Sequence, residues 1–82
     1  MLTGKKVLVI GLAKSGKAAV RLLKKLNATI TVNEFQEASK IPEYQQYLDM
    51  GIEMVTGSHP TELFERDFDF VIKNPGINYH KP

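Results

Sequence analysis

The sequence contains no cysteine and only two histidines. Without cysteine, neither a disulfide framework nor a cysteine-based zinc site can form. His59 and His80 are isolated, and neither lies at metal-ligand spacing from an acid or from the other histidine. The composition therefore excludes disulfide-rich domains and predicts no metal site in this chain.

Long apolar runs are also missing. No stretch approaches the length of about 20 residues needed to cross a bilayer. The first residues lack a basic segment followed by an apolar signal core. We therefore expect a cytoplasmic protein with no membrane partner.

The sequence also has little excess charge of either sign. It contains 11 Lys and Arg and 9 Asp and Glu, which leave a net charge of +2. Nucleic-acid binding ordinarily needs a clear basic face or a base-reading motif, and the sequence has neither. We expect no nucleic-acid partner. The basic bias of the first 25 residues fits a phosphate on a small ligand equally well.

What is present is an alternation of strand and helix patterns. Continuous apolar or β-branched segments predict strands at residues 6–10, 29–32, 52–55 and 68–72. Helical spacing predicts a helix after the first strand, with its apolar face formed by Ala19, Leu22, Leu23 and Leu26. Asn27 is placed to end that helix. Pro42 and Gly51 bound a second helix, and residues 61–64 form a short helix or turn.

This alternation is typical of the α/β class, with a Rossmann-like open parallel sheet of about four strands and helices on both faces. We expect residues 1–82 to form a single domain, because the sequence shows no linker and no repeat. A chain this short buries only part of its surface, so we expect modest stability. Because a doubly wound sheet ordinarily continues past its fourth strand, we expect this domain to be the N-terminal piece of a longer multidomain protein.

A glycine loop, Gly11-Leu12-Ala13-Lys14-Ser15-Gly16, directly follows the first strand. Gly11 permits a sharp turn from strand to helix. The helix start then offers free backbone N–H groups and the positive end of its dipole to a phosphate. Lys14 adds a positive charge and Ser15 a hydroxyl.

Three interpretations of this loop compete. The dinucleotide fingerprint G-x-G-x-x-G is matched at Gly11 and Gly16, with Ala13 in place of the middle glycine. The P-loop pattern fails, because Ala18 stands where the magnesium-binding hydroxyl should be. The third interpretation is a glycine turn that merely packs a helix.

Two further segments lie at the predicted carboxyl ends of strands. Asn33-Glu34 follows the second strand, where an acid of dinucleotide-binding domains bonds the ribose. Glu34 could hold a ribose or a base edge and Phe35 could stack on a base, or Glu34 could be a solvated carboxylate in a loop. Asn74-Pro75-Gly76 ends the fourth strand at the same predicted edge. Ser15 has no histidine in a useful context, and we predict no catalytic residue.

Three segments, residues 9–16, 31–34 and 73–77, occur in order and together resemble the N-terminal domain of the Mur ligases that add D-glutamate during peptidoglycan synthesis. The resemblance implies a multidomain enzyme that joins D-glutamate to UDP-N-acetylmuramoyl-L-alanine, with ATP and magnesium, through an acyl phosphate. It implies that the N-terminal domain binds the UDP moiety, and that the ATP loop, metal ligands and D-glutamate site belong to later domains. This fragment alone would then be catalytically inert, and we expect it to be monomeric.

Carried over by position, the resemblance predicts the substrate contacts. Lys14, Ser15 and Gly16 would meet the diphosphate. Asn33, Glu34 and Phe35 would lie near the uracil and ribose. Asn74 and Gly76 would close the other side. The alternative is a NAD-binding domain of a dehydrogenase or redox sensor, which Glu34 favours and which Ala13 and Lys14 disfavour. A purely structural domain is the third hypothesis.

Overall fold

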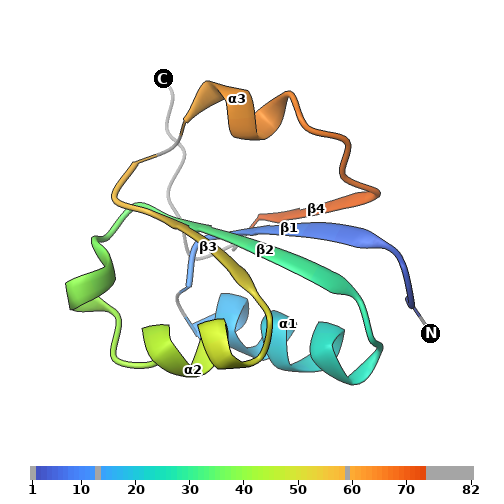
Figure 1. The fold of residues 1–82 in the computed structure, drawn as a ribbon, viewed down its shortest axis with the longest axis horizontal. Coiled ribbons are helices and arrows are strands. Elements are labelled where there is room, and N and C mark those ends of the chain that lie inside the picture. Colours follow the sequence, from blue (N-terminus) through green and yellow to red (C-terminus); the bar gives the residue numbers. More distant parts are fainter. Residues whose placement is uncertain (1, 13, 59, 74–82) are drawn as a thin grey trace.

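The structure is a computed structural model that describes residues 2–12, 14–58 and 60–73, with residues 14 and 15 described by their backbone alone. Strands and helices alternate along these residues (Figure 1). The elements in order are β1 (Lys6–Ile10), α1 (Lys14–Lys25), β2 (Thr29–Glu34), the 3-10 helix η1 (Ala38–Lys40), α2 (Tyr44–Asp49), β3 (Glu53–Thr56), α3 (Thr61–Phe64) and β4 (Phe70–Lys73).

The four strands form one sheet in the order β3-β2-β1-β4, and all pairs are parallel. The chain moves from β1 outward to β3 and then crosses to the opposite side of β1 to form β4. The direction of winding therefore reverses beside β1. In open parallel sheets this reversal opens a crevice at the carboxyl ends of the strands, where ligands bind. The predicted α/β class with a parallel sheet is confirmed.

One face of the sheet carries the larger core. Alternate residues of a strand point to opposite faces, and Val7 and Val9 of β1 join Ile30 and Val32 of β2 against the helices α1 and α2 (Figure 1). The remaining buried members of this cluster are Leu12, Val20, Leu23, Ile41, Tyr47 and Ile52.

The other face is covered by α3 and the segments around it (Figure 1). Leu8 and Ile10 of β1 pack there against Leu63, the buried residue of the single-turn helix α3. Val55 and Phe68 lie at the margin of this smaller cluster. The predicted helices on both faces are confirmed, although the second layer is much thinner than the first.

The second strand is longer than its pattern predicted. It continues through Asn33 and Glu34, because both residues pair with β3, opposite Val55 and Thr56. A polar side chain weakens the strand pattern in the sequence, whereas the backbone ladder depends only on a neighbour being present. The third and fourth strands are found where predicted but begin one and two residues later, at Glu53 and Phe70.

The predicted face of α1 was partly wrong. Leu22 is 58% exposed, and Val20, which the pattern did not select, is fully buried. Leu23 is buried as predicted. The predicted helix ends are confirmed, since Asn27 and Gly51 both adopt the left-handed conformation with φ of +64° and +82°. None of the described helices is long and apolar enough to cross a bilayer.

Candidate phosphate and nucleotide site

The glycine loop lies where β1 passes into α1. Gly11 has a φ of +93°, a conformation that a side chain would strain. Its backbone N–H donates to the carbonyl of Asn33 at 2.8 Å, which extends the β1–β2 ladder by one bond. Leu12 is buried in the larger core, and the helix starts at Lys14. The turn from strand to helix therefore takes three residues.

Helix α1 directs its amino end at this turn. The first N–H groups of a helix have no partner within the helix, and they carry the positive end of its dipole. The first turn of α1 contains no acid, and its last turn contains Lys24 and Lys25. Gly16 lies buried in the first turn. This arrangement, at the carboxyl edge of a parallel sheet and beside its winding reversal, favours an anionic phosphate group.

Glu34 reaches back from the end of β2 to this loop. Its Oε1 accepts a hydrogen bond from the backbone N–H of Leu12 at 2.8 Å, and its Oε2 accepts one from Gln36 at 2.8 Å. The carboxylate is half-buried. Glu34 is therefore the last residue of a strand, and its carboxylate is hydrogen-bonded to the backbone. The interpretation of Glu34 as a solvated carboxylate in a loop is wrong. A contact with a ribose or base stays a prediction.

Asn33 has a structural function that its sequence position did not reveal. The side chain is fully buried, and its Nδ2 donates to the carbonyls of Val55 at 3.0 Å and Ser58 at 2.8 Å. These bonds tie β2 to β3 and to the segment that follows β3. The signal that could have found this role is a polar residue at an inward position beside a buried strand. A contact of Asn33 with uracil stays a prediction.

The other predicted contacts are described less fully. Phe35 is 67% exposed at the same edge of the sheet, where a base could reach it. The side chains of Lys14 and Ser15, and the residues Asn74 and Gly76, lie outside what the structure describes. The last described residue, Lys73, pairs with Ile10, so β1 and β4 end at the same level of the sheet.

Lys17, which resembles a P-loop lysine, has an ionic partner. Its Nζ lies 3.2 Å from Oε2 of Glu43, and both side chains are about one-third exposed or slightly more. The pair bridges α1 to the turn before α2. Burial raises the pKa of the adjacent Tyr47, and the Glu43 carboxylate raises it further. Ala18 remains where a P-loop has its hydroxyl.

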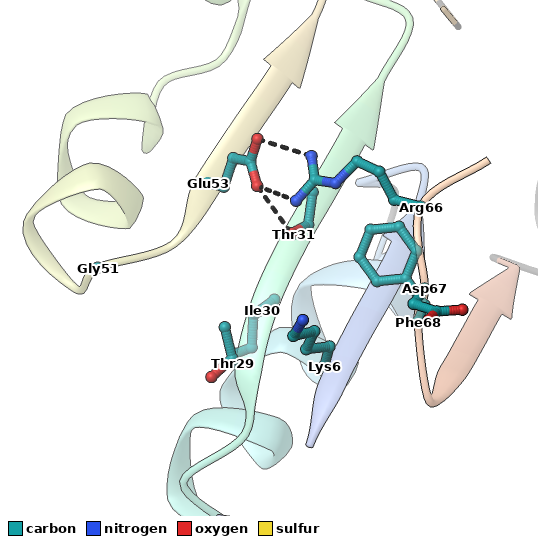
Figure 2. A pocket seen from close by; sticks show the side chains of 9 residues that line it. All are labelled: Lys6, Thr29, Ile30, Thr31, Gly51, Glu53, Arg66, Asp67 and Phe68. Carbon is teal, nitrogen blue, oxygen red and sulfur yellow. Dashed lines mark hydrogen bonds and ion pairs between the residues drawn. The ribbon is translucent and has the colours of Figure 1, made fainter. Parts of the chain in front are cut away.

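A pocket of about 330 Å³ opens at the other end of the sheet, near the amino ends of β1 and β2 (Figure 2). It is bounded by Arg66 and Glu53, whose side chains form a bidentate pair with N–O distances of 2.8 and 3.0 Å. Thr31 donates its hydroxyl to the same carboxylate at 3.1 Å. The hydrogen bonds from Arg66 lower the pKa of Glu53.

Sequence reasoning missed this cluster, because Glu53 and Arg66 stand 13 positions apart in the sequence, a separation that does not indicate contact. Arg66 also lies over the ring of Phe68, 5.2 Å from its centroid (Figure 2). Both guanidinium nitrogens that face the pocket are bonded to Glu53. The cation is thus already neutralised, and the pocket lies away from the glycine loop. We assign it a structural role in holding the chain between α3 and β4 against β3.

A family model and individual relatives both relate this chain to one kind of ligase. Residues 5–82 match the family described as Mur ligase MurD-like, N-terminal domain. The UDP-N-acetylmuramoylalanine–D-glutamate ligase of Streptococcus agalactiae serotype Ia is 55% identical over 78 residues. The ligase of the same name from Streptococcus pyogenes serotype M49 is 50% identical over 78 residues. Each match covers 95% of this chain and 17% of the relative, so the chain spans a small part of the relatives' length.

Proposed function

This chain belongs to the MurD-like Mur ligases, as part of their N-terminal domain, and on that premise we propose that it binds the UDP moiety of UDP-N-acetylmuramoyl-L-alanine. The full-length protein would then be the ligase that adds D-glutamate to this substrate in peptidoglycan synthesis. The proposal includes a cytoplasmic location. The dehydrogenase alternative finds no support, since the relatives named above are ligases.

One observation carries the proposal within the structure. The glycine loop turns at Gly11 and presents the amino end of α1, free of acids, at the carboxyl edge of the sheet beside the β1–β4 reversal. A diphosphate is a compact dianion whose oxygens accept several N–H donors, which matches the donors of a first helical turn. The exposed ring of Phe35 lies at the same edge and offers a surface on which a pyrimidine can stack.

We assign ATP, magnesium and D-glutamate to the remainder of the full-length protein. A Mg–ATP loop needs a free lysine followed by a hydroxyl. Here Lys17 is paired with Glu43, and Ala18 follows it. The residues at this loop therefore do not fit Mg–ATP. Within the described residues, no group of three or more His, Cys, Asp or Glu is arranged to hold a metal ion. On this proposal the chain alone binds substrate and catalyses no step.

Calorimetric titration of the full-length protein tests the proposal. We expect UDP to bind, UMP to bind more weakly because it lacks the second phosphate, and NADH to give no heat. A coupled assay should show phosphate release from ATP only when UDP-N-acetylmuramoyl-L-alanine and D-glutamate are both present. Absence of UDP binding at millimolar concentration would contradict the proposal, and tighter binding of NADH than of UDP would restore the dinucleotide alternative.

A further inference from the structure

An apolar groove runs between α1 and the outer strand β4, on the face of the sheet that carries the larger core. Its volume is about 270 Å³, and its lining consists of Leu2, Val7, Leu23, Phe70, Val71 and Ile72. Phe70 and Ile72 lie opposite Val7 and Val9 in the sheet, so their side chains point to the same face. Phe70 is nevertheless 50% exposed. The larger core therefore covers β1 and β2 but ends before β4.

Helix α1 turns an apolar flank toward this groove. Its other flank contacts α2, because the side chains of Lys17 and Lys24 bond to residues at the two ends of that helix. Each residue of a helix is rotated by about 100° from the one before. Ala19, Leu22 and Leu26 therefore lie on the flank that faces away from α2. Leu22 is 58% exposed there, and no described element covers it.

The exposed apolar surface continues around β4. Val71 pairs with Leu8, on the opposite face from Phe70, and is 52% exposed. Strands of parallel sheets are ordinarily buried on both faces, and contiguous exposed apolar surface marks a contact site. The chain spans only 17% of the length of the relatives that it matches. The remainder of the full-length protein is tethered to this surface, and a tethered segment competes at high effective concentration with any separate partner.

The winding of the sheet decides which tethered segment can reach the groove. From β1 to β3 the chain moves in one direction, with α1 and α2 on the groove face, and from β3 to β4 it moves back, with α3 on the other face (Figure 1). A parallel strand added beside β4 continues in this second direction. Because parallel crossovers are right-handed in about 98% of cases, the helix before that strand joins α3. Such a crossover covers the face of Val71 and leaves the groove open.

The spacing of helices and strands points to the element that fits the groove. Neighbouring helices pack about 8–10 Å apart, and neighbouring strands lie about 4.8 Å apart. A helix placed beside α1 therefore lies over β4 and over the strand next to it. Such a helix can rest on Phe70 from above and on Leu22 from the side.

We propose that the groove is the docking site of a helix from the remainder of the same full-length protein, and that this helix comes after a strand added beside β4. The helix presents an apolar stripe to the groove and a polar face to solvent. Its docking fixes a later part of the protein to α1, the helix whose amino end faces the candidate phosphate site. This docking does not depend on the proposed function, because it needs no nucleotide.

Hydroxyl-radical footprinting of the unmodified full-length protein tests the proposal. Leu22 and Leu48 form a matched pair, because both are leucines on neighbouring helices of one face, with exposed fractions of 58% and 39%. Without a docked helix, Leu22 should be oxidised about 1.5 times as fast as Leu48, as these fractions require. With the helix in place, we expect Leu22 to react about fivefold more slowly than Leu48, because a covered side chain reacts only after local opening. A rate for Leu22 equal to or above that of Leu48 overturns the inference.

Photo-crosslinking identifies the segment that covers Leu22. Leu22→p-benzoylphenylalanine in the full-length protein should form a cross-link within one polypeptide, to a peptide beyond the strand that follows β4. Arg21→p-benzoylphenylalanine is the control, because Arg21 is exposed on the α2 side of the same helix and should not reach that peptide. Mixing 15N-labelled and unlabelled protein before illumination separates cross-links within one chain from those between copies.

Each of the other outcomes of the cross-linking experiment overturns the inference. These outcomes are no cross-link from position 22, a cross-link between isotopically different copies, and a cross-link to the crossover of about a dozen or more residues that directly follows β4. An equal yield of the same product from position 21 also overturns it. Because neither measurement uses UDP, a failure here leaves the proposed function intact, and a failure to bind UDP leaves the docking intact.

Discussion

Replacement of Leu63 by alanine should destabilise the domain more than any equivalent change on the surface of α1. Leu63 is 3% exposed and is the residue with which α3 enters the small cluster around Leu8 and Ile10. Leu→Ala changes in cores cost about 2–5 kcal/mol. Because this layer is thin and one side of α3 can settle into the space, we expect the lower part of that range, about 2–3 kcal/mol.

This loss is a large fraction of the free energy of unfolding of the whole domain. At about 0.05–0.15 kcal/mol per residue, a domain of this size has about 4–12 kcal/mol of stability. A loss of about 2–3 kcal/mol lowers the Tm of a domain of 60–100 residues by about 8–24 °C. Urea unfolding of the 82-residue chain, followed by circular dichroism, measures the change as a lower midpoint at an unchanged slope.

Leu22 provides the matched control. It was predicted to lie in the core, but it is 58% exposed on α1. Leu22→Ala should change the free energy of unfolding by no more than about 0.5 kcal/mol, as is usual for surface positions. If the two leucines cost the same, or if Leu22 costs more, the described packing of both faces of the sheet is wrong.

Three further outcomes follow from the site and its surroundings. Asn33→Ala should cost about 1–3 kcal/mol in urea unfolding, because it removes a buried side chain and leaves the carbonyls of Val55 and Ser58 without their donor; a neutral result would remove the structural role of Asn33. The lowered pKa of Glu53 contributes stability that is present above its ordinary pKa of 4.5 and is lost as the pH falls through its lower folded value. The Tm of the unmodified chain should therefore fall more than that of Glu53→Gln between pH 6 and pH 3, by a small amount because the pair is half-exposed; parallel Tm curves would contradict this. Lys14→Met should weaken UDP binding about tenfold and Lys17→Met by less than about threefold, since Lys17 is held by Glu43; the reverse order would favour a P-loop-like role for Lys17.

Much of the fold could be predicted from local patterns. The apolar run at residues 6–10 and the β-branched residues at 29–32 both form strands, because burial on two faces requires apolar side chains at consecutive positions. Asn27 and Gly51 end helices for a reason that is entirely local, since both adopt a positive φ. The boundaries of β2 and the buried face of α1 could not be predicted in this way. They depend on which strand is paired with residues 33–34, and on how α1 is rotated over the sheet.

In the candidate site, too, some features could be predicted from local sequence and others depend on tertiary contacts. Sequence by itself determined the glycine loop, because a turn at Gly11 and a helix start that lacks acids are properties of consecutive residues. It determined the family as well, through segments that stand in a fixed order. Only the tertiary structure decided what the polar residues at the end of β2 do. Their partners, Leu12 for Glu34 and Val55 for Asn33, are 22 residues away in opposite directions and are brought near by the parallel register. A hydrogen bond requires its two atoms to lie about 3 Å apart, and for residues so distant in sequence that proximity is a property of the folded chain alone.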